Sequence, residues 1–154
     1  MTEEEFAEHL AAAIVAQGDA FGVALPAKYA VFPPVRVSKK PPVHCFVVPV
    51  GYESSVESPG RLRELTFSIG IVAKLPMPEA GKEGEFDLGD YPATTASLIR
   101  WLEREDDEDN PGYQPPDGWT LHNVSNSPKF RPDHLQEFKQ YTGIVQATFQ
   151  QHGD

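Results

Sequence analysis

Cysteine is nearly absent from this chain, which has one, Cys45, among 154 residues. A single thiol excludes an internal disulfide framework and any cysteine-based zinc cluster. No apolar run approaches the ~18 residues that are needed to cross a bilayer. The opening segment, MTEEEFAEHL, also lacks the basic start of a signal peptide. We therefore expect neither a membrane span nor a secretory leader.

Basic residues are also scarce, since 13 Lys and Arg stand against 23 Asp and Glu, a formal net charge of −10. This balance argues against a general nucleic-acid or anionic-membrane binder. Hydrophobic residues make up 40% and aromatic residues 10% of the chain, which is lean for a globular protein but too rich for full disorder. The length is that of about one domain, so we expect residues 1–154 to form a single domain.

Signatures of catalysis are missing as well. The sequence has no H-E-x-x-H, no G-x-G-x-x-G, no P-loop and no G-x-S-x-G. The neighbours His44 and Cys45 should point to opposite faces of a strand, so Cys45 is read as a small core residue. His122 and His134 flank a loop and could meet, but solvated or singly hydrogen-bonded histidines are the favoured interpretation. We predict no catalytic, cofactor-binding or metal-binding residue and no enzyme.

The acidic run 103–109 invites comparison with a calcium-binding loop. Counted from Asp107, the third position (Asp109) and the sixth (Gly112) fit an EF-hand pattern. The fifth position is proline and the twelfth is glycine, so two supporting ligands are missing. A solvated acidic loop is therefore the preferred interpretation.

The hydrophobic periodicity predicts an α+β fold. Thr2 and Glu5 form a capping box at the start of a helix that ends near Gly18. Two helices packed on a mostly antiparallel sheet of about four to five strands are expected, in the order α-β-β-β-α-β-β. The other expected elements are strands at 29–32, 43–50 and 65–73, a helix at 91–102, and strands at 119–124 and 141–149.

Two of the strand patterns carry more information. Residues 43–50 are apolar on both faces, as in a central strand that is covered on two sides. Residues 65, 67, 69, 71 and 73 are apolar and alternate with Glu64, Thr66, Ser68, Gly70 and Lys74, which predicts a strand with one buried face. The segment 51–60 between them is too long for a tight hairpin turn and is read as an extended arm or a mobile loop. The segment 76–89 is read as an exposed loop.

The second half of the chain carries a resemblance to known proteins. The segments 119–128, 130–138 and 141–149 are similar to those of small phage and prophage proteins in which a strand, a proline-containing stretch and a terminal strand follow a helix. The order of elements resembles that of the tail terminator (minor tail) proteins of long-tailed bacteriophages.

This resemblance implies a structural virion subunit that assembles into a hexameric ring. The ring would cap the finished tail tube, made of tail tube protein, and meet the head–tail connector on the other side. DNA would pass through without specific binding, and no cofactor, catalysis or membrane would be involved. The implied location is the virion tail or neck, and the host cytoplasm during assembly.

Closed rings need contacts between two different patches of the subunit. The segments 51–60 and 76–89 are the candidate docking surfaces, although exposed loops of this kind can also be merely solvated. A second hypothesis is another head–tail joining or tail-completion adaptor, and a third is a small enzyme that uses loop acids, with or without a divalent cation. The candidate interface residues are Tyr52, Val56, Arg61, Phe86, Leu88, Asp106, Asp107 and Asp109.

Overall fold

The computed structural model describes residues 1–33, 36–57, 60–76, 81, 87–104, 109 and 111–153. Within these residues the chain forms a five-stranded sheet in the order β1-β2-β3-β5-β4. The strands are β1 (Ala27–Tyr29), β2 (His44–Glu57), β3 (Gly60–Lys74), β4 (Trp119–Ser125) and β5 (Gln140–Gly153). The helices are α1 (Glu3–Ala16), α2 (Tyr91–Glu103) and α3 (Pro132–Phe138).

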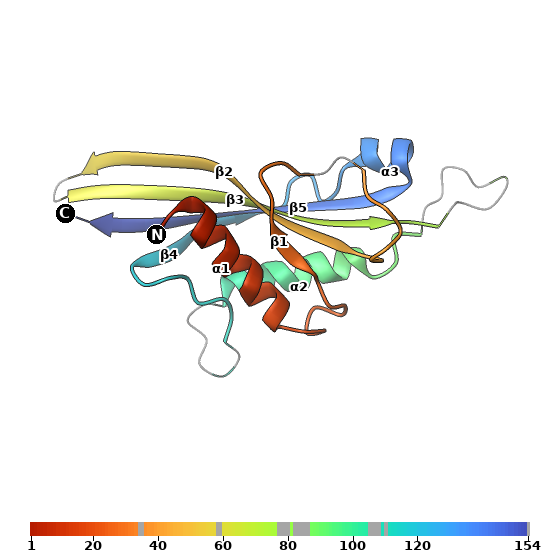
Figure 1. Ribbon diagram of the computed structural model, residues 1–154, viewed down its shortest axis with the longest axis horizontal. Coiled ribbons are helices and arrows are strands. Elements are labelled where there is room, and N and C mark those ends of the chain that lie inside the picture. The colour runs from red at the N-terminus through yellow and green to blue at the C-terminus, as the bar shows by residue number, and fades with distance from the viewer. Residues whose placement is uncertain are drawn as a thin grey trace.

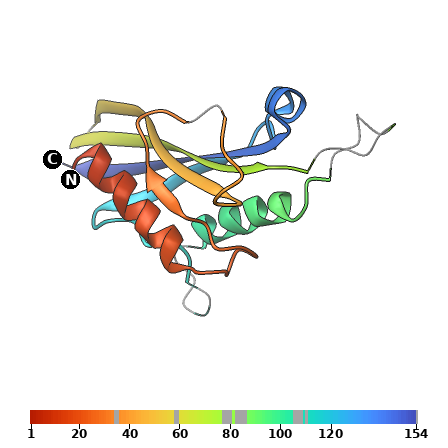
Figure 2. The ribbon, with the colours of Figure 1, turned by 45° about the vertical axis from the view of Figure 1, so that its right-hand side comes forward.

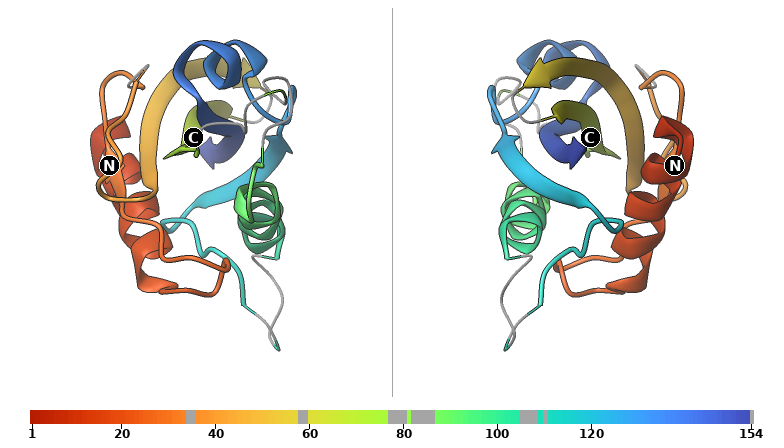
Figure 3. Two further views of the ribbon diagram at one scale, coloured as in Figure 1. Left: turned by 90° about the vertical axis from the view of Figure 1, so that its right-hand side faces the viewer. Right: turned by 90° about the vertical axis from the view of Figure 1, so that its left-hand side faces the viewer.

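The sheet is mostly antiparallel, which confirms the predicted α+β class. β2 pairs with β3, β3 with β5 and β5 with β4 in antiparallel register, while β1 pairs in parallel with β2. α1 and α2 lie on one face of the sheet and α3 lies on the other (Figure 1). Seen along the long axis, the sheet is strongly curled, and α1 and α2 cover separate parts of one face (Figure 3).

The main core lies between the sheet and the pair α1 and α2. The N-terminal cap of α1 forms as predicted, because the Thr2 hydroxyl accepts a hydrogen bond from the Glu5 N–H at 3.1 Å. One turn later Phe6 is fully buried. Its ring centroid lies 4.9 Å from that of Phe67, on β3, and 5.0 Å from that of Phe149, on β5. The helix is therefore held to the sheet by aromatic packing.

α2 is fixed at both ends by contacts that the sequence pattern does not show. Near its start, the hydroxyl groups of Thr95 and Tyr141 lie 2.8 Å apart inside the core. At its C-terminal end, the N–H of Gly112 donates to the carbonyl of Arg104 and the N–H of Tyr113 donates to that of Trp101. The returning chain thus satisfies carbonyls that the helix leaves without partners.

For the segment 51–60 the structure decides between the two alternatives: its described part is an extended arm, because β2 and β3 stay paired as far as Glu57 and Gly60. Two sequence predictions need correction. β1 begins and ends earlier than the expected 29–32. The predicted proline-containing stretch includes a third helix, α3, which begins at Pro132. Proline suits this first helical position because its missing N–H would have no partner there.

Candidate functional site

The β2–β3 hairpin extends past the part of the sheet that the helices cover. It points to the end of the molecule where both chain termini lie, and α3 lies toward the opposite end (Figures 1 and 2). We call the paired segments 50–57 and 60–65 the arm. Two of the predicted contact residues, Val56 and Arg61, face each other across the arm near its tip. Val56 is 80% exposed.

The arm presents apolar side chains to solvent. Val50 and Tyr52 are also about half exposed, with 51% and 52% of their surface accessible. β1 pairs with β2 only from Cys45 to Val47, so the outer edge of β2 beyond Val47 has no strand partner in the described part of the chain. Such an edge carries unpaired backbone groups and is a ready template for contact with another chain.

The arginines of the arm have only neutral side-chain partners among the described residues. Arg61 donates to the Ser54 hydroxyl at 2.9 Å, and Arg63 donates to the side-chain oxygen of Gln151 at 3.1 Å. Ser54 and Val56 share a face with these arginines, because they lie directly opposite Arg63 and Arg61 in the antiparallel register. This face of the arm is therefore apolar and basic.

A pocket of about 390 Å³ lies on the other side of the sheet, beside α3. Its floor is apolar and is formed by Phe46, Val48 and Val72, which are buried in a second small hydrophobic cluster. This cluster confirms that β2 is covered on both faces, as its sequence predicts. The remaining lining residues are Pro33, Ser68, Gly70, Arg131, Asp133, His134, Glu137, Phe138, Thr142 and Ile144.

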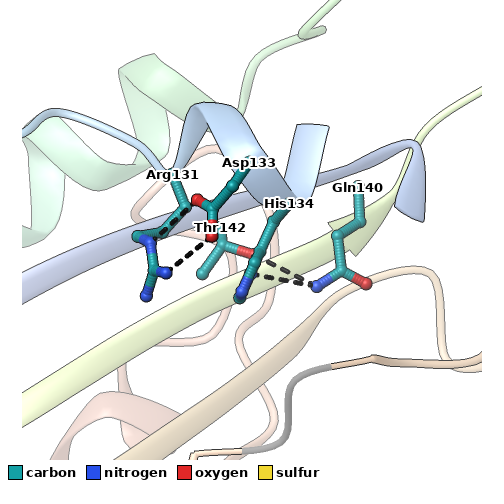
Figure 4. A network of polar contacts seen from close by, with 5 residues as sticks. All are labelled: Arg131, Asp133, His134, Gln140 and Thr142. Atoms are coloured by element: carbon teal, nitrogen blue, oxygen red, sulfur yellow. Dashed lines mark hydrogen bonds and ion pairs between the residues drawn. The ribbon is translucent and has the colours of Figure 1, made fainter. Parts of the chain in front are cut away.

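Three polar side chains meet beneath α3 at the edge of this pocket (Figure 4). Thr142 Oγ1 lies 2.9 Å from His134 Nδ1 and 3.2 Å from Gln140 Nε2. All three residues are at least nine-tenths buried. Gln140 also accepts a hydrogen bond from the N–H of Val37 at 3.3 Å, which joins the segment after β1 to the same group. We call His134, Gln140 and Thr142 the polar trio.

α3 is held over the pocket by charged groups at both ends. Arg131 and Asp133 form a two-bond ion pair, with nitrogen–oxygen distances of 3.1 and 2.7 Å (Figure 4). The hydrogen bonds from Arg131 hold the pKa of the Asp133 carboxyl below its usual value. At the other end Lys74 Nζ donates to the carbonyl of Phe138 at 2.6 Å. A cation at this position also suits the negative end of the helix.

The margin of the pocket carries two cation–π contacts. Lys28 Nζ lies 5.4 Å from the ring centroid of Phe46, and the Arg36 guanidinium lies 5.7 Å from that of Phe138. Glu137, by contrast, is exposed on α3, and no described cation lies within ion-pair distance of it. The α3 margin therefore presents an available negative charge.

The remaining predicted contact residues lie elsewhere. Leu88 is half-buried and packs against the main core, and Asp109 is exposed. Phe86, Asp106 and Asp107 lie outside the described residues.

The cysteine and the histidines do not assemble a reactive group in the described chain. Cys45 is 1% exposed, and burial raises the pKa of its thiol to about 12, so the predicted core role is confirmed. His134 belongs to the polar trio, while His122 is exposed on β4 and lines a different hollow. Among the described residues, no three His, Cys, Asp or Glu side chains are placed to hold a metal ion.

The pocket beside α3 was not found from the sequence. Its floor residues were assigned to strands, but the helix that forms its wall was not predicted. The available signal was Arg131-Pro132-Asp133, a proline at the first helical position followed by an acid in the first turn.

Comparisons with known proteins do not assign the chain to a family. No family model matches the chain, and a search of curated proteins finds no match. Within the described residues, no helix is both long enough and apolar enough to span a membrane.

Proposed function

We propose that this chain is a structural subunit of a bacteriophage tail or neck, of the tail-terminator type. In this role copies of the chain form a ring that caps the tail tube and joins it to the head-side connector. DNA passes through the ring without specific binding, in keeping with the net charge of −10. The site of action is the virion tail or neck, after assembly in the host cytoplasm.

The arm is the observation that carries this proposal. It places Val50, Tyr52 and Val56 in solvent along a strand whose outer edge lacks a partner in the described chain. Exposed apolar side chains gathered in one place mark contact surfaces, and an open strand edge favours contact with another chain. The α+β fold and the element order of the phage proteins described above support the same role.

Light scattering over a wide concentration range tests ring formation. We expect the mass to rise from one subunit to a closed, fixed multiple, either alone or after addition of assembled tail tubes. Electron microscopy of the mixture should then show added density at one end of each tube. A chain that stays monomeric at every concentration and leaves tube ends bare would overturn the proposal.

A pair of matched variants makes the test specific to the arm. Val56→Asp introduces a charge on the apolar face and should abolish assembly. Ser55→Asp introduces the same charge one residue away, on the opposite face of the strand, and should have little effect. Both positions are exposed, so neither variant should change the thermal unfolding of the subunit by more than a few degrees.

The mixture with tail tubes also distinguishes a tail terminator from a different head–tail joining adaptor. An adaptor would bind the head-side connector while leaving the tube ends uncapped.

A further inference from the structure

We propose that the pocket beside α3 is the seat for the arm of a neighbouring copy of this chain. This inference rests on the proposed function, because it names the two surfaces that meet in the ring. The occupant is the face of the arm that carries Tyr52, Val56 and Arg61. The seat is the apolar floor of Phe46, Val48 and Val72 together with the α3 margin.

The placement of the two surfaces suits a contact between successive copies. The arm projects at one end of the long axis, and α3 stands toward the other end on the opposite face of the sheet from α1 and α2 (Figure 1). Two different patches at separate places on one subunit give a head-to-tail contact. Such contacts close into a ring when the rotation between neighbours permits it.

The apolar chemistry of the two surfaces matches. The arm offers a valine that is 80% exposed and a tyrosine that is 52% exposed. The pocket offers about 390 Å³ above a floor of phenyl and valine side chains. Aromatic and aliphatic side chains that enter a preformed pocket are the usual anchors of protein interfaces.

The polar groups match as well. His134 lines the pocket and uses its Nδ1 for Thr142, and its Nε2 has no hydrogen-bond partner among the described residues. A tyrosine hydroxyl can either donate to or accept from such a nitrogen. Tyr52 can therefore supply both the apolar ring and the polar end that this pocket can receive.

Charge fixes the direction of the contact. Arg61 has only a neutral partner, Ser54, in the described chain, and Glu137 is exposed at the margin of the pocket. Lys28 and Arg36 already lie over the rings of Phe46 and Phe138. The negative charge of Glu137 is thus available to the arginine of an incoming arm, and such pairs set register and partner choice.

Charge reversal tests the pairing. Glu137→Arg and Arg61→Glu should each weaken association by at least about tenfold, because each places like charges together. An equimolar mixture of the two variants should recover much of the loss, because every contact between unlike variants pairs an arginine with a glutamate. Gln136→Arg is the control: it places an arginine at the exposed neighbouring position, which does not line the pocket, and should change association by less than about twofold.

Disulfide trapping gives an independent test, because the native Cys45 is buried and will not compete. Val56→Cys and Glu137→Cys are made separately, mixed and oxidised. A covalent dimer that forms only in the mixture supports the inference. A dimer of Val56→Cys with itself would show that arms pair with arms, and would overturn it.

The outcomes also separate the two proposals. If the wild-type chain forms rings, yet neither charge reversal nor trapping has an effect, the arm has another seat and this inference is wrong while the proposed function stands. If the wild-type chain never assembles, even on tail tubes, the proposed function fails first.

Discussion

Replacement of Thr142 by valine is expected to destabilise the fold, although the two side chains have nearly the same shape. The hydroxyl of Thr142 is the central member of the polar trio, bonded to both His134 and Gln140. Valine keeps the branched side chain that suits a strand but removes both hydrogen bonds. His134 Nδ1 and Gln140 Nε2 would then each lose the hydrogen bond to Thr142, and both residues are buried.

The magnitude follows from the number of groups affected. Leaving a buried donor or acceptor unpaired costs about 1–3 kcal/mol, and two such groups lose a bond here. The high strand propensity of valine offsets a part of this loss in stability. The offset is small, because the strand propensities of all residue types span only about 1 kcal/mol. We expect the free energy of unfolding to fall by about 2 kcal/mol, which for a chain of this size is a drop in melting temperature of about 4–8 °C.

Thr148→Val is the matched control for thermal unfolding followed by circular dichroism. Thr148 lies six residues further along β5 on the same face, where its hydroxyl lies 2.9 Å from that of Thr66 in a part-buried position. Water can replace that bond, so the change in stability should stay within about 0.5 kcal/mol. If Thr142→Val were as stable as this control, the polar trio would contribute nothing to holding α3.

Three further predictions concern the rest of the fold. Gly112→Ala should cost about 3 kcal/mol in a denaturant titration, since a Cβ there would overlap the backbone carbonyl oxygen of Trp101; wild-type stability would refute this close approach. The Cys45 thiol should resist a maleimide at pH 8 and react only on unfolding, because its pKa is near 12; rapid labelling of the folded chain would contradict its burial. An NMR titration should show that the pKa of the Asp133 carboxyl is lower in the folded chain than in the unfolded chain. In the Arg131→Gln variant this pKa should rise toward its usual value. The contribution of this carboxyl to stability is present above the unfolded pKa and is lost as the pH falls through the folded pKa.

β3 could be predicted because burial of one of its faces leaves a period of two in the sequence. Residues 65, 67, 69, 71 and 73 are all buried, as their pattern indicates. The apolar run 43–50 also predicted a second covered face, and Phe46 and Val48 confirm it. The N-terminal helix was found from its cap and its apolar stripe, which are both local signals.

The sequence leaves open whether the arm is an extended hairpin or a loop, because its polar residues hide its pairing. Residues 51–57 carry no apolar alternation, since neither face of the hairpin is fully buried there. Pairing with β3 holds them in a strand, and β3 is in turn paired with β5 as far as Arg61 and Gly153. Strand propensity depends on such neighbours more than on the residues themselves, so local sequence cannot choose between an extended arm and a loop.

The candidate pocket was missed for a related reason. α3 has only seven residues, which is too short for a periodic pattern to be seen. Its position over the sheet is set by the polar trio, which joins α3 to the start of β5, and by Lys74, which lies 64 residues before its partner Phe138. Sequence spacing alone does not report such contacts.

The character of the arm also bears on how copies of the chain would meet. Two open strand edges could pair directly, which leads to unlimited aggregation in many proteins. Here Glu53 is exposed within the free stretch of β2 and Arg61 lies on the neighbouring strand, and charged side chains on an edge oppose such pairing. The net charge of −10 adds repulsion between copies. Association then requires a surface that differs from the arm and complements it. The apolar pocket with Glu137 at its margin has those properties, and a contact between unlike surfaces is what a closed ring needs.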